Sequence, residues 1–232
     1  MTGQDLREAR KRHSWTQEQA AEHLGVSQAY VSMLERDRRP LPSHLVKSVL
    51  HEYEVSPLAL PLRGTDTWAA VDNDVLATQL AGLGYPGFSY LHARATWNPA
   101  ELLVAALAKD DLEPRVAEAL PWLALRYRDA DWNWVVRETK LRDEQNRLGF
   151  AVMLARELAQ QQNDTPTAEK FLLLEQQLER SKLASVGTFC HERMTQTEKR
   201  WLQEKSTPEA RRWNLLSDLG PEHLVHAASY NN

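Results

Sequence analysis

The 232-residue chain lacks the features that mark secreted and membrane proteins. It has one cysteine, Cys190, so no internal disulfide can form. It has no apolar run long enough to cross a membrane, and its first residues are polar, unlike those of a signal peptide. A single thiol also fits a reducing compartment. We therefore expect a cytoplasmic protein that makes no contact with a membrane.

The sequence also lacks the motifs of enzyme chemistry. His51 and His191 are each followed by glutamate, as in a zinc-protease helix, but the second histidine of that motif is missing. His223 and His226 stand about one helical turn apart, yet no second pair completes a four-ligand site. Cys190 would point away from His191 on a helix, and no glycine-rich phosphate loop is present. We predict no enzyme activity, no cofactor and no metal site.

Positive charge is scarce, because the net charge of the chain is −4. Residues 1–63 carry nine Lys/Arg and eight Asp/Glu, whereas residues 64–232 carry nineteen and twenty-four. Lysine and arginine supply the sequence-independent part of DNA affinity. A single copy would therefore bind DNA weakly, and specific binding would require a dimer.

What the sequence does contain is a pair of capped helical segments in residues 16–36. Thr16 and Gln19 form a capping box that opens the first helix. Gly25 supplies the positive φ that ends it, and Ser27 caps the second helix. Apolar residues recur at helical spacing in both segments and give each one buried face. These residues are Ala20, Ala21, Leu24, Val31 and Leu34. The first turn of the second helix stays free to face a partner.

Residues 16–36 resemble the helix-turn-helix of the Cro/CI-type (XRE, lambda-repressor-like) family. The resemblance to this family covers about residues 3–62. The resemblance implies a five-helix domain that binds double-stranded DNA. It places base contacts at the exposed face of the second helix, at Gln28, Ala29, Ser32 and Met33. Phosphate contacts are expected from Gln17, Ser27, Tyr30, Arg36, Arg38 and Arg39. Arg10 and Glu35 occupy positions where the family often has a structural ion pair.

The chemistry of these side chains agrees with that assignment. The carboxamide of Gln28 can form hydrogen bonds with adenine N6 and N7 at the same time, and Ala29 offers an apolar contact to a thymine methyl. Met33 departs from the polar residue that is common there, so we expect apolar contact in place of hydrogen bonding. The alternative interpretation is a helical hairpin that serves only for packing. We favour DNA binding because capping, hinge, buried spacing and exposed amides all agree.

Beyond the motif we predict an all-α chain with two further parts. The DNA-binding domain covers residues 1–63, with a linker at Pro61 to Asp66. Residues 67–160 form a helical domain that is rich in tryptophan, since seven of the eight tryptophans lie at or after position 68. These tryptophans either fill a helical core, which we favour, or line a ligand or partner surface, with the segment Tyr85 to Tyr90 as its exposed part.

Residues 161–232 are expected to form a helical extension for dimerisation or partner binding. Its helices have good start signals but narrow apolar faces, so they either lie against the middle domain or wait for a partner. We expect a partner protein, for example a cognate toxin, to bury five large side chains. These are Phe171, Leu174, Leu178, Trp201 and Trp213.

The sequence as a whole predicts a sequence-specific transcriptional regulator. The interpretation that we prefer is a repressor that binds an inverted-repeat operator as a homodimer. If the extension binds a toxin, this repressor would also be an autoregulating antitoxin. A ligand-sensing or phage-type repressor remains open. So does a protein-interaction or inhibitor module that the N-terminal domain tethers to DNA.

Overall fold

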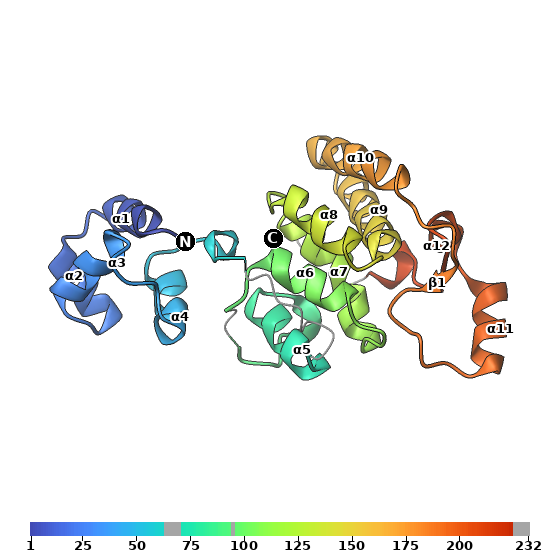
Figure 1. The fold of residues 1–232 in the computed structure, drawn as a ribbon, viewed down its shortest axis with the longest axis horizontal. Coiled ribbons are helices and arrows are strands. Elements are labelled where there is room, and N and C mark those ends of the chain that lie inside the picture. Colours follow the sequence, from blue (N-terminus) through green and yellow to red (C-terminus); the bar gives the residue numbers. More distant parts are fainter. Residues whose placement is uncertain (63–70, 94–95, 225–232) are drawn as a thin grey trace.

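The computed structural model describes residues 1–62, 71–93 and 96–224, and within them the chain is almost entirely helical (Figure 1). These residues form twelve α-helices and a single pair of strands of two residues each. The all-α fold class is therefore confirmed. The expected linker is described only at Pro61 and Leu62, because its remaining residues, 63–66, lie outside the described residues.

The N-terminal domain is a small bundle of helices around its own core. Its elements are α1 (Gly3–Arg12), α2 (Gln17–Leu24), α3 (Gln28–Glu35), α4 (Ser43–Glu52) and the 3₁₀ turn η1 (Pro57–Ala59). The expected fifth helix is thus a single 3₁₀ turn, which Pro57 opens at its first position. The core is built from one apolar face of each α-helix, including Leu6, Ala20, Val31, Leu34 and Val49.

Helix α1 meets the end of α3 at close range, and Gly3 makes this contact possible. A Cβ atom on Gly3 would lie 2.4 Å from the carbonyl oxygen of Leu34, which no side chain can occupy. The backbone N–H of Gly3 also donates to Asp37 Oδ1 at 2.6 Å, just past the end of α3. The position of α3 is therefore fixed from α1 as well as from α2.

The remaining described residues form a larger helical body around a second core. In chain order its elements are α5 (Asn73–Gly82), η3 (Pro86–Phe88), α6 (Pro99–Leu107), α7 (Pro114–Arg126), α8 (Trp132–Lys140), α9 (Gln145–Gln161), α10 (Thr165–Glu179), β1 (Gly187–Thr188), α11 (Gln196–Lys205), α12 (Pro208–Arg212), β2 (Leu215–Leu216) and η4 (Pro221–His223). Strands β1 and β2 pair in parallel, with Gly187 opposite Leu215.

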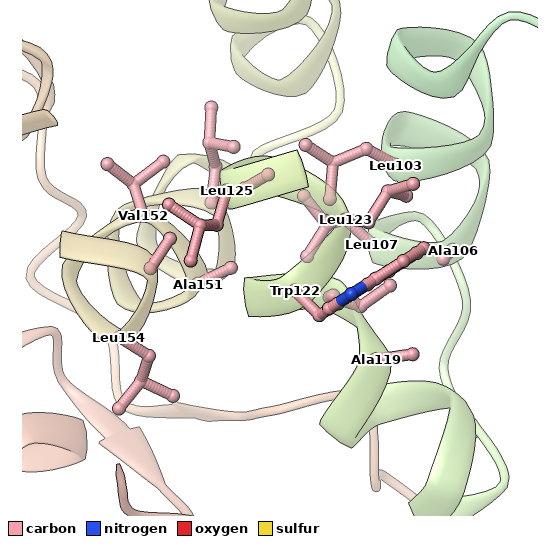
Figure 2. Packing of buried hydrophobic residues seen from close by; sticks show 14 of the residues in the cluster. Leu103, Ala106, Leu107, Ala119, Trp122, Leu123, Leu125, Ala151, Val152 and Leu154 are labelled. Atoms are coloured by element: carbon pink, nitrogen blue, oxygen red, sulfur yellow. The ribbon is translucent and has the colours of Figure 1, made fainter. Parts of the chain in front are cut away.

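The middle of this core lies between α6, α7 and α9 (Figure 2). All nine residues of α6 are buried, which suits a helix that is apolar on every side. Core packing is confirmed as the role of Trp122, Trp134 and Trp213, all of which are buried. Trp68 lies outside the described residues.

The segment Tyr85 to Tyr90 is mostly interior. Tyr85 and Phe88 are buried and their rings pack edge to face, with centroids 5.6 Å apart. Of the three aromatic residues in this segment, Tyr90 alone is exposed. The less favoured alternative, an exposed aromatic surface in this segment, therefore fails for Tyr85 and Phe88, because the 3₁₀ turn η3 directs Phe88 into the core.

The C-terminal helices belong to the same core as the middle of the chain. Helix α10 lies along α9, and the buried side chains of Phe171, Leu174 and Leu178 join one apolar cluster that extends from Leu76 to Leu224. Helix α10 takes its burial from α9, so it lies against the middle of the chain, which is the first of the two alternatives open from the sequence. The core shows no break near residue 160.

Trp213 completes this packing through a contact with α9. A Cβ atom at Gly149 would lie 2.3 Å from the ring of Trp213, so the indole packs directly against the helix backbone. Nothing in the spacing of apolar residues signals this contact, since a glycine inside a helix is usually read as a weak point.

The two cores are joined at the described end of the N-terminal domain. The side-chain amide of Asn98 donates to the carbonyl oxygens of Leu58 at 3.0 Å and Leu60 at 2.8 Å. Its Oδ1 atom accepts from the N–H of Ala100, which caps α6. Leu58 and Leu62 pack against the body core. One asparagine therefore starts α6 and also attaches η1 to the body.

Candidate nucleic-acid interface

The turn between α2 and α3 has the geometry that the sequence predicts. Thr16 and Gln19 bond each other reciprocally at the start of α2. Gly25 ends α2 with φ 65° and ψ 36°, the left-handed conformation that glycine adopts most easily. Ser27 then caps α3 by accepting from the N–H of Tyr30 at 3.3 Å. These caps leave the first turn of α3 at the surface.

A chain of hydrogen bonds runs from this exposed turn back into the domain. Gln28 Nε2 donates to Gln17 Oε1 at 2.7 Å, and Gln17 Nε2 donates to Glu35 Oε2 at 2.9 Å. Arg10 then holds Glu35 with two bonds, from Nε at 2.5 Å and from Nη2 at 3.1 Å. The first turn of α3 is thereby connected to α2, to its own C-terminal end and to α1.

The ion pair between Arg10 and Glu35 is largely buried, with side chains 11% and 3% exposed. Burial acts to raise the pKa of Glu35, but the hydrogen bonds from Arg10 and Gln17 and the charge of Arg10 outweigh it and lower the pKa. The bond to Glu35 raises the pKa of Arg10. Arg10 also donates to the carbonyl oxygen of Trp15 at 2.7 Å. Both charges are thus fixed in place, as their expected structural role requires.

The residues expected at base edges lie on α3 at different depths. Gln28 and Ala29 are exposed in the first turn, whereas Ser32 and Met33 are half-buried one turn later. A helix that enters the major groove reads bases mainly with its first residues. Gln28 and Ala29 are therefore the most accessible of the four for direct readout.

The residues expected at phosphates surround the same face. Ser27, Arg36, Arg38 and Arg39 are exposed, while Gln17 and Tyr30 are half-buried. The guanidinium of Arg39 lies over the ring of Tyr30, 5.7 Å from its centroid. Asp37, with φ 53°, turns the chain directly after α3 and places Arg36 and Arg38 at the end of the helix.

Sequence reasoning found these positions but missed the bonds between them. From the sequence, Gln17 is expected at a phosphate and Gln28 at a base, with no contact between them. The structure joins the two amides, so a phosphate contact at Gln17 and a base contact at Gln28 would act on one bonded unit. The start positions of α2 and α3 were visible in the sequence, but the crossing of the helices that brings the amides together was not.

Comparison with known families agrees with this geometry. Residues 6–60 match the protein family described as helix-turn-helix. The N-terminal domain is a helix-turn-helix domain of the Cro/CI (XRE) type. The chain is accordingly a DNA-binding transcription regulator of this kind. Comparisons with curated proteins and with solved structures gave no match.

The five residues expected to bind a partner protein lie in very different surroundings. Phe171, Leu174, Leu178 and Trp213 are buried in the body core, so they are not accessible to a partner in this structure. Trp201 on α11 is 49% exposed. Four of the five side chains therefore stabilise the body itself, and Trp201 alone of them is at the surface.

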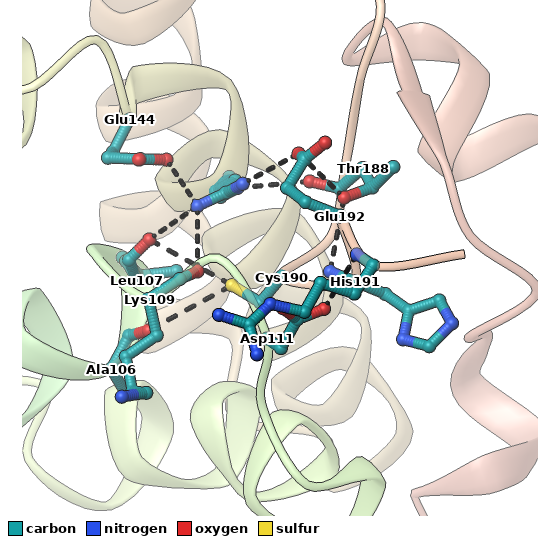
Figure 3. Close-up of polar contacts among 11 residues, drawn as sticks. Ala106, Leu107, Lys109, Asp111, Glu144, Thr188, Cys190, His191 and Glu192 are labelled. Atoms are coloured by element: carbon teal, nitrogen blue, oxygen red, sulfur yellow. Dashed lines mark hydrogen bonds and ion pairs between the residues drawn. The ribbon is translucent and has the colours of Figure 1, made fainter. Parts of the chain in front are cut away.

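The body also contains a polar centre that sequence reasoning missed (Figure 3). Arg147 of α9 is 9% exposed at its side chain and sits among acceptors from three distant segments. Its Nη1 atom donates to Leu107 O at 2.9 Å and Lys109 O at 3.0 Å, its Nε to Thr188 O at 3.0 Å and its Nη2 to Glu192 Oε1 at 2.9 Å, and Glu144 Oε2 lies 3.0 Å from Nη1. Arg147 thus fastens the end of α6 and the β1 segment to α9.

Two neighbours of Arg147 have altered acidity. Burial raises the pKa of Glu144 to about 7 against the attraction of Arg147, and the charges of Asp110 and Glu192 act in the same direction as burial. Burial also raises the pKa of the Cys190 thiol to about 12. A thiol of this acidity is not a nucleophile at neutral pH. Cys190 is a packing residue whose sulfur faces the carbonyl oxygens of Ala106 and Leu107.

Other expectations bear on metals and membranes. Among residues 1–62, 71–93 and 96–224, no three histidine, cysteine, aspartate or glutamate side chains are placed to hold a metal ion. His226, one half of the histidine pair noted in the sequence, lies outside the described residues. Of the described helices, none has both the length and the apolar character needed to span a membrane.

Proposed function

We propose that the chain is a sequence-specific transcriptional repressor that binds an inverted-repeat operator as a homodimer. The observation that carries this proposal is the bonded chain from Gln28 through Gln17 to the buried Glu35. It holds a carboxamide in place at the exposed tip of a helix-turn-helix domain. A fixed side chain loses less conformational entropy when it bonds a base than a freely rotating one.

The chemistry of the tip favours operators with A·T pairs. Gln28 can bond adenine N6 and N7 in the major groove, and Ala29 next to it can contact a thymine methyl. Arg36, Arg38 and Arg39 lie at the end of α3, where phosphate contacts would set the register without reading sequence. We infer a half-site in which adenine and thymine occupy neighbouring positions.

Substitution of Gln28 separates base readout from phosphate binding. A selection from random DNA first supplies the operator, and binding is then measured to the operator and to unrelated DNA. We expect Gln28→Ala to lose about 1–3 kcal/mol of discrimination and to keep its affinity for unrelated DNA. Arg38→Ala is the matched control: it should weaken binding to both DNAs alike and lower the salt slope by about one unit. Equal loss on both DNAs for Gln28→Ala would contradict the assignment.

The proposed dimer follows from the size and charge of the DNA-binding domain. One domain of this kind presents a single recognition helix, and residues 1–63 carry a net charge of only about +1. Two copies on an inverted repeat double the contacts, with half-sites about 34–36 Å apart. Footprinting should show two protected half-sites at that spacing, and sedimentation should show two chains per operator. One chain bound at full affinity would contradict the dimer.

The antitoxin role remains a second candidate, supported by Trp201 and by the thin packing of α11. Leu202 is the only buried residue of α11, so most of this helix is free for contact with another protein. Co-purification of the full chain with the product of a neighbouring gene tests the role, and Trp201→Ala should release that product. Retention of the product by the variant would show that α11 does not bind it.

A further inference from the structure

The body contains a cleft that DNA binding does not use. It lies between the start of α7, the β1–β2 pair, α11 and η4, and has a volume of about 400 Å³. Sites for small molecules commonly measure roughly 300–1,000 Å³. The cleft is therefore large enough for a small organic ligand.

The floor of the cleft is apolar and its rim is aromatic. Leu112, Phe189, Leu202 and Leu216 line the cleft and are buried. Trp201 stands among the lining residues at 49% exposure, and no other tryptophan of the described residues is exposed. An exposed indole beside buried aliphatic side chains offers both apolar area and a π face to a ligand.

The charged groups that line the cleft are carboxylates. Glu118, Glu198 and Asp218 face it from α7, α11 and the segment after β2, and no lysine or arginine lines it among the described residues. Glu198 also accepts the N–H of Thr195 at the start of α11. Within the described chain, no ion pair neutralises Glu118 or Asp218.

Two histidines, His191 and His223, also line the cleft. His223 Nδ1 accepts the backbone N–H of Gly220 at 3.0 Å and lies 3.5 Å from Glu222 Oε1, outside the cleft lining. The backbone N–H of His191 bonds Thr188, which holds that residue at the end of β1. The cleft therefore combines an apolar floor, an indole and a negative potential.

We propose that this cleft binds a small hydrophobic organic cation. The cation would lie over the indole of Trp201, where the ring quadrupole attracts positive charge, with its apolar groups on the floor. Glu118 and Asp218 would favour the cation over a neutral or anionic molecule of the same shape. The proposal is independent of the DNA operator, because every lining residue belongs to the body.

Two probes of matched shape and opposite charge test the proposal. Tetraphenylphosphonium and tetraphenylborate are titrated into the full-length protein without DNA, and binding is followed by calorimetry and by tryptophan fluorescence. We expect saturable binding of tetraphenylphosphonium at least about tenfold tighter than that of tetraphenylborate. Trp201→Phe should remove most of the fluorescence change and keep measurable heat of binding.

Removal of the carboxylates gives the decisive arm of the experiment. Glu118→Gln combined with Asp218→Asn should weaken tetraphenylphosphonium binding at least about tenfold and leave helical content unchanged by circular dichroism. Glu18→Gln combined with Glu22→Gln, two exposed positions on α2, removes the same charge elsewhere and should leave binding unchanged. Equal affinity for the two probes, or an unaffected cleft variant, would overturn the proposal. Tighter binding of a lysine-rich peptide than of tetraphenylphosphonium would also overturn it, in favour of a protein partner.

Discussion

Each of the two parts of the chain has a largely buried arginine with several hydrogen bonds, and these two arginines differ in the groups that they bond. Arg10 in the helix-turn-helix domain bonds the side chain of Glu35 and one carbonyl oxygen close in sequence. Arg147 in the body bonds three carbonyl oxygens and two carboxylates, most of them about forty residues away. Arg10 orients one helix for an outside partner, whereas Arg147 closes the body on itself.

This difference decides what each part can do. The bonds of Arg10 end at a surface, through Glu35, Gln17 and the exposed Gln28. Three of the bonds of Arg147 end at backbone carbonyl oxygens of the body, and the other two end at carboxylates of the body. The network of Arg10 therefore orients the side chains of a binding site, whereas the network of Arg147 stabilises the fold of the body.

Removal of each arginine should affect its own core, with the larger effect in the body. We expect Arg147→Met to lower the free energy of unfolding of the body by about 3–5 kcal/mol, because the largely buried Glu144 carboxylate loses its ion pair and three carbonyl oxygens lose a donor. Arg10→Met should lower that of the N-terminal domain by about 2–4 kcal/mol and also weaken operator binding. Hydrogen exchange read region by region in the full chain measures both values.

Two exposed positions serve as controls for these variants. Arg137 is 63% exposed and its partner Glu138 keeps a second ion pair with Arg142, so Arg137→Met should cost less than about 1 kcal/mol. Lys11→Met makes the same change on exposed α1. If Arg147→Met proved as mild as Arg137→Met, the body would not depend on its buried network, and the contrast between the two arginines would fail.

The same contrast explains how much the sequence could predict. The helix-turn-helix domain rests on local signals, such as Thr16 with Gln19, Gly25 and Ser27, and all of these appear in the structure as expected. Pro99 and Pro114 stand at the first helical position of α6 and α7, which is another local signal of a helix start. These features need only neighbouring residues.

The body depends on contacts between distant residues that no short pattern encodes. The acceptors of Arg147 are mostly backbone carbonyls, which every residue carries, so their positions leave no trace in the sequence. Trp213 packs against Gly149 across the core, and α10 takes its burial from α9. The packing of residues 161–224 is hard to predict from the sequence. The narrow apolar face of a helix such as α10 is visible there, but the helix that covers it, α9, is not.

The junction between the two cores provides a third and smaller test. Asn98→Asp keeps the oxygen that caps α6 but removes the two amide bonds to Leu58 and Leu60. We expect the hydrogen-exchange protection of η1 to fall by about 1–3 kcal/mol, and we expect the N-terminal cap of α6 to be kept. Calorimetry should show the two cores unfolding further apart in temperature than in the unchanged chain. Coincident transitions in the variant would show that Asn98 does not couple the cores.

The smallest expected effect is a difference in pH dependence between the two cores. The pKa of Glu35 is lowered in the folded state, so its contribution is present above its unfolded pKa and is lost as the pH falls. The pKa of Glu144 is raised to about 7, so the folded body holds a proton more tightly than the unfolded chain does. The stability of the body should therefore fall as the pH rises from about 4.5 to 7.

Glu144→Gln isolates this effect, because it keeps the shape of the side chain and removes its titration. Between pH 5 and pH 7.5 the unchanged body should lose about 1–2 kcal/mol more than the variant, measured by hydrogen exchange in the full chain. The N-terminal domain should behave in the opposite way, because it loses stability when the pH falls and Glu35 takes up a proton. Glu35→Gln should remove this loss on acidification. A body that gains stability over this range, with no difference from Glu144→Gln, would show that Arg147 keeps Glu144 ionised in the folded chain. Arg10 and Arg147 would then each keep a neighbouring carboxylate ionised, and they would differ only in the carbonyl oxygens that they bond.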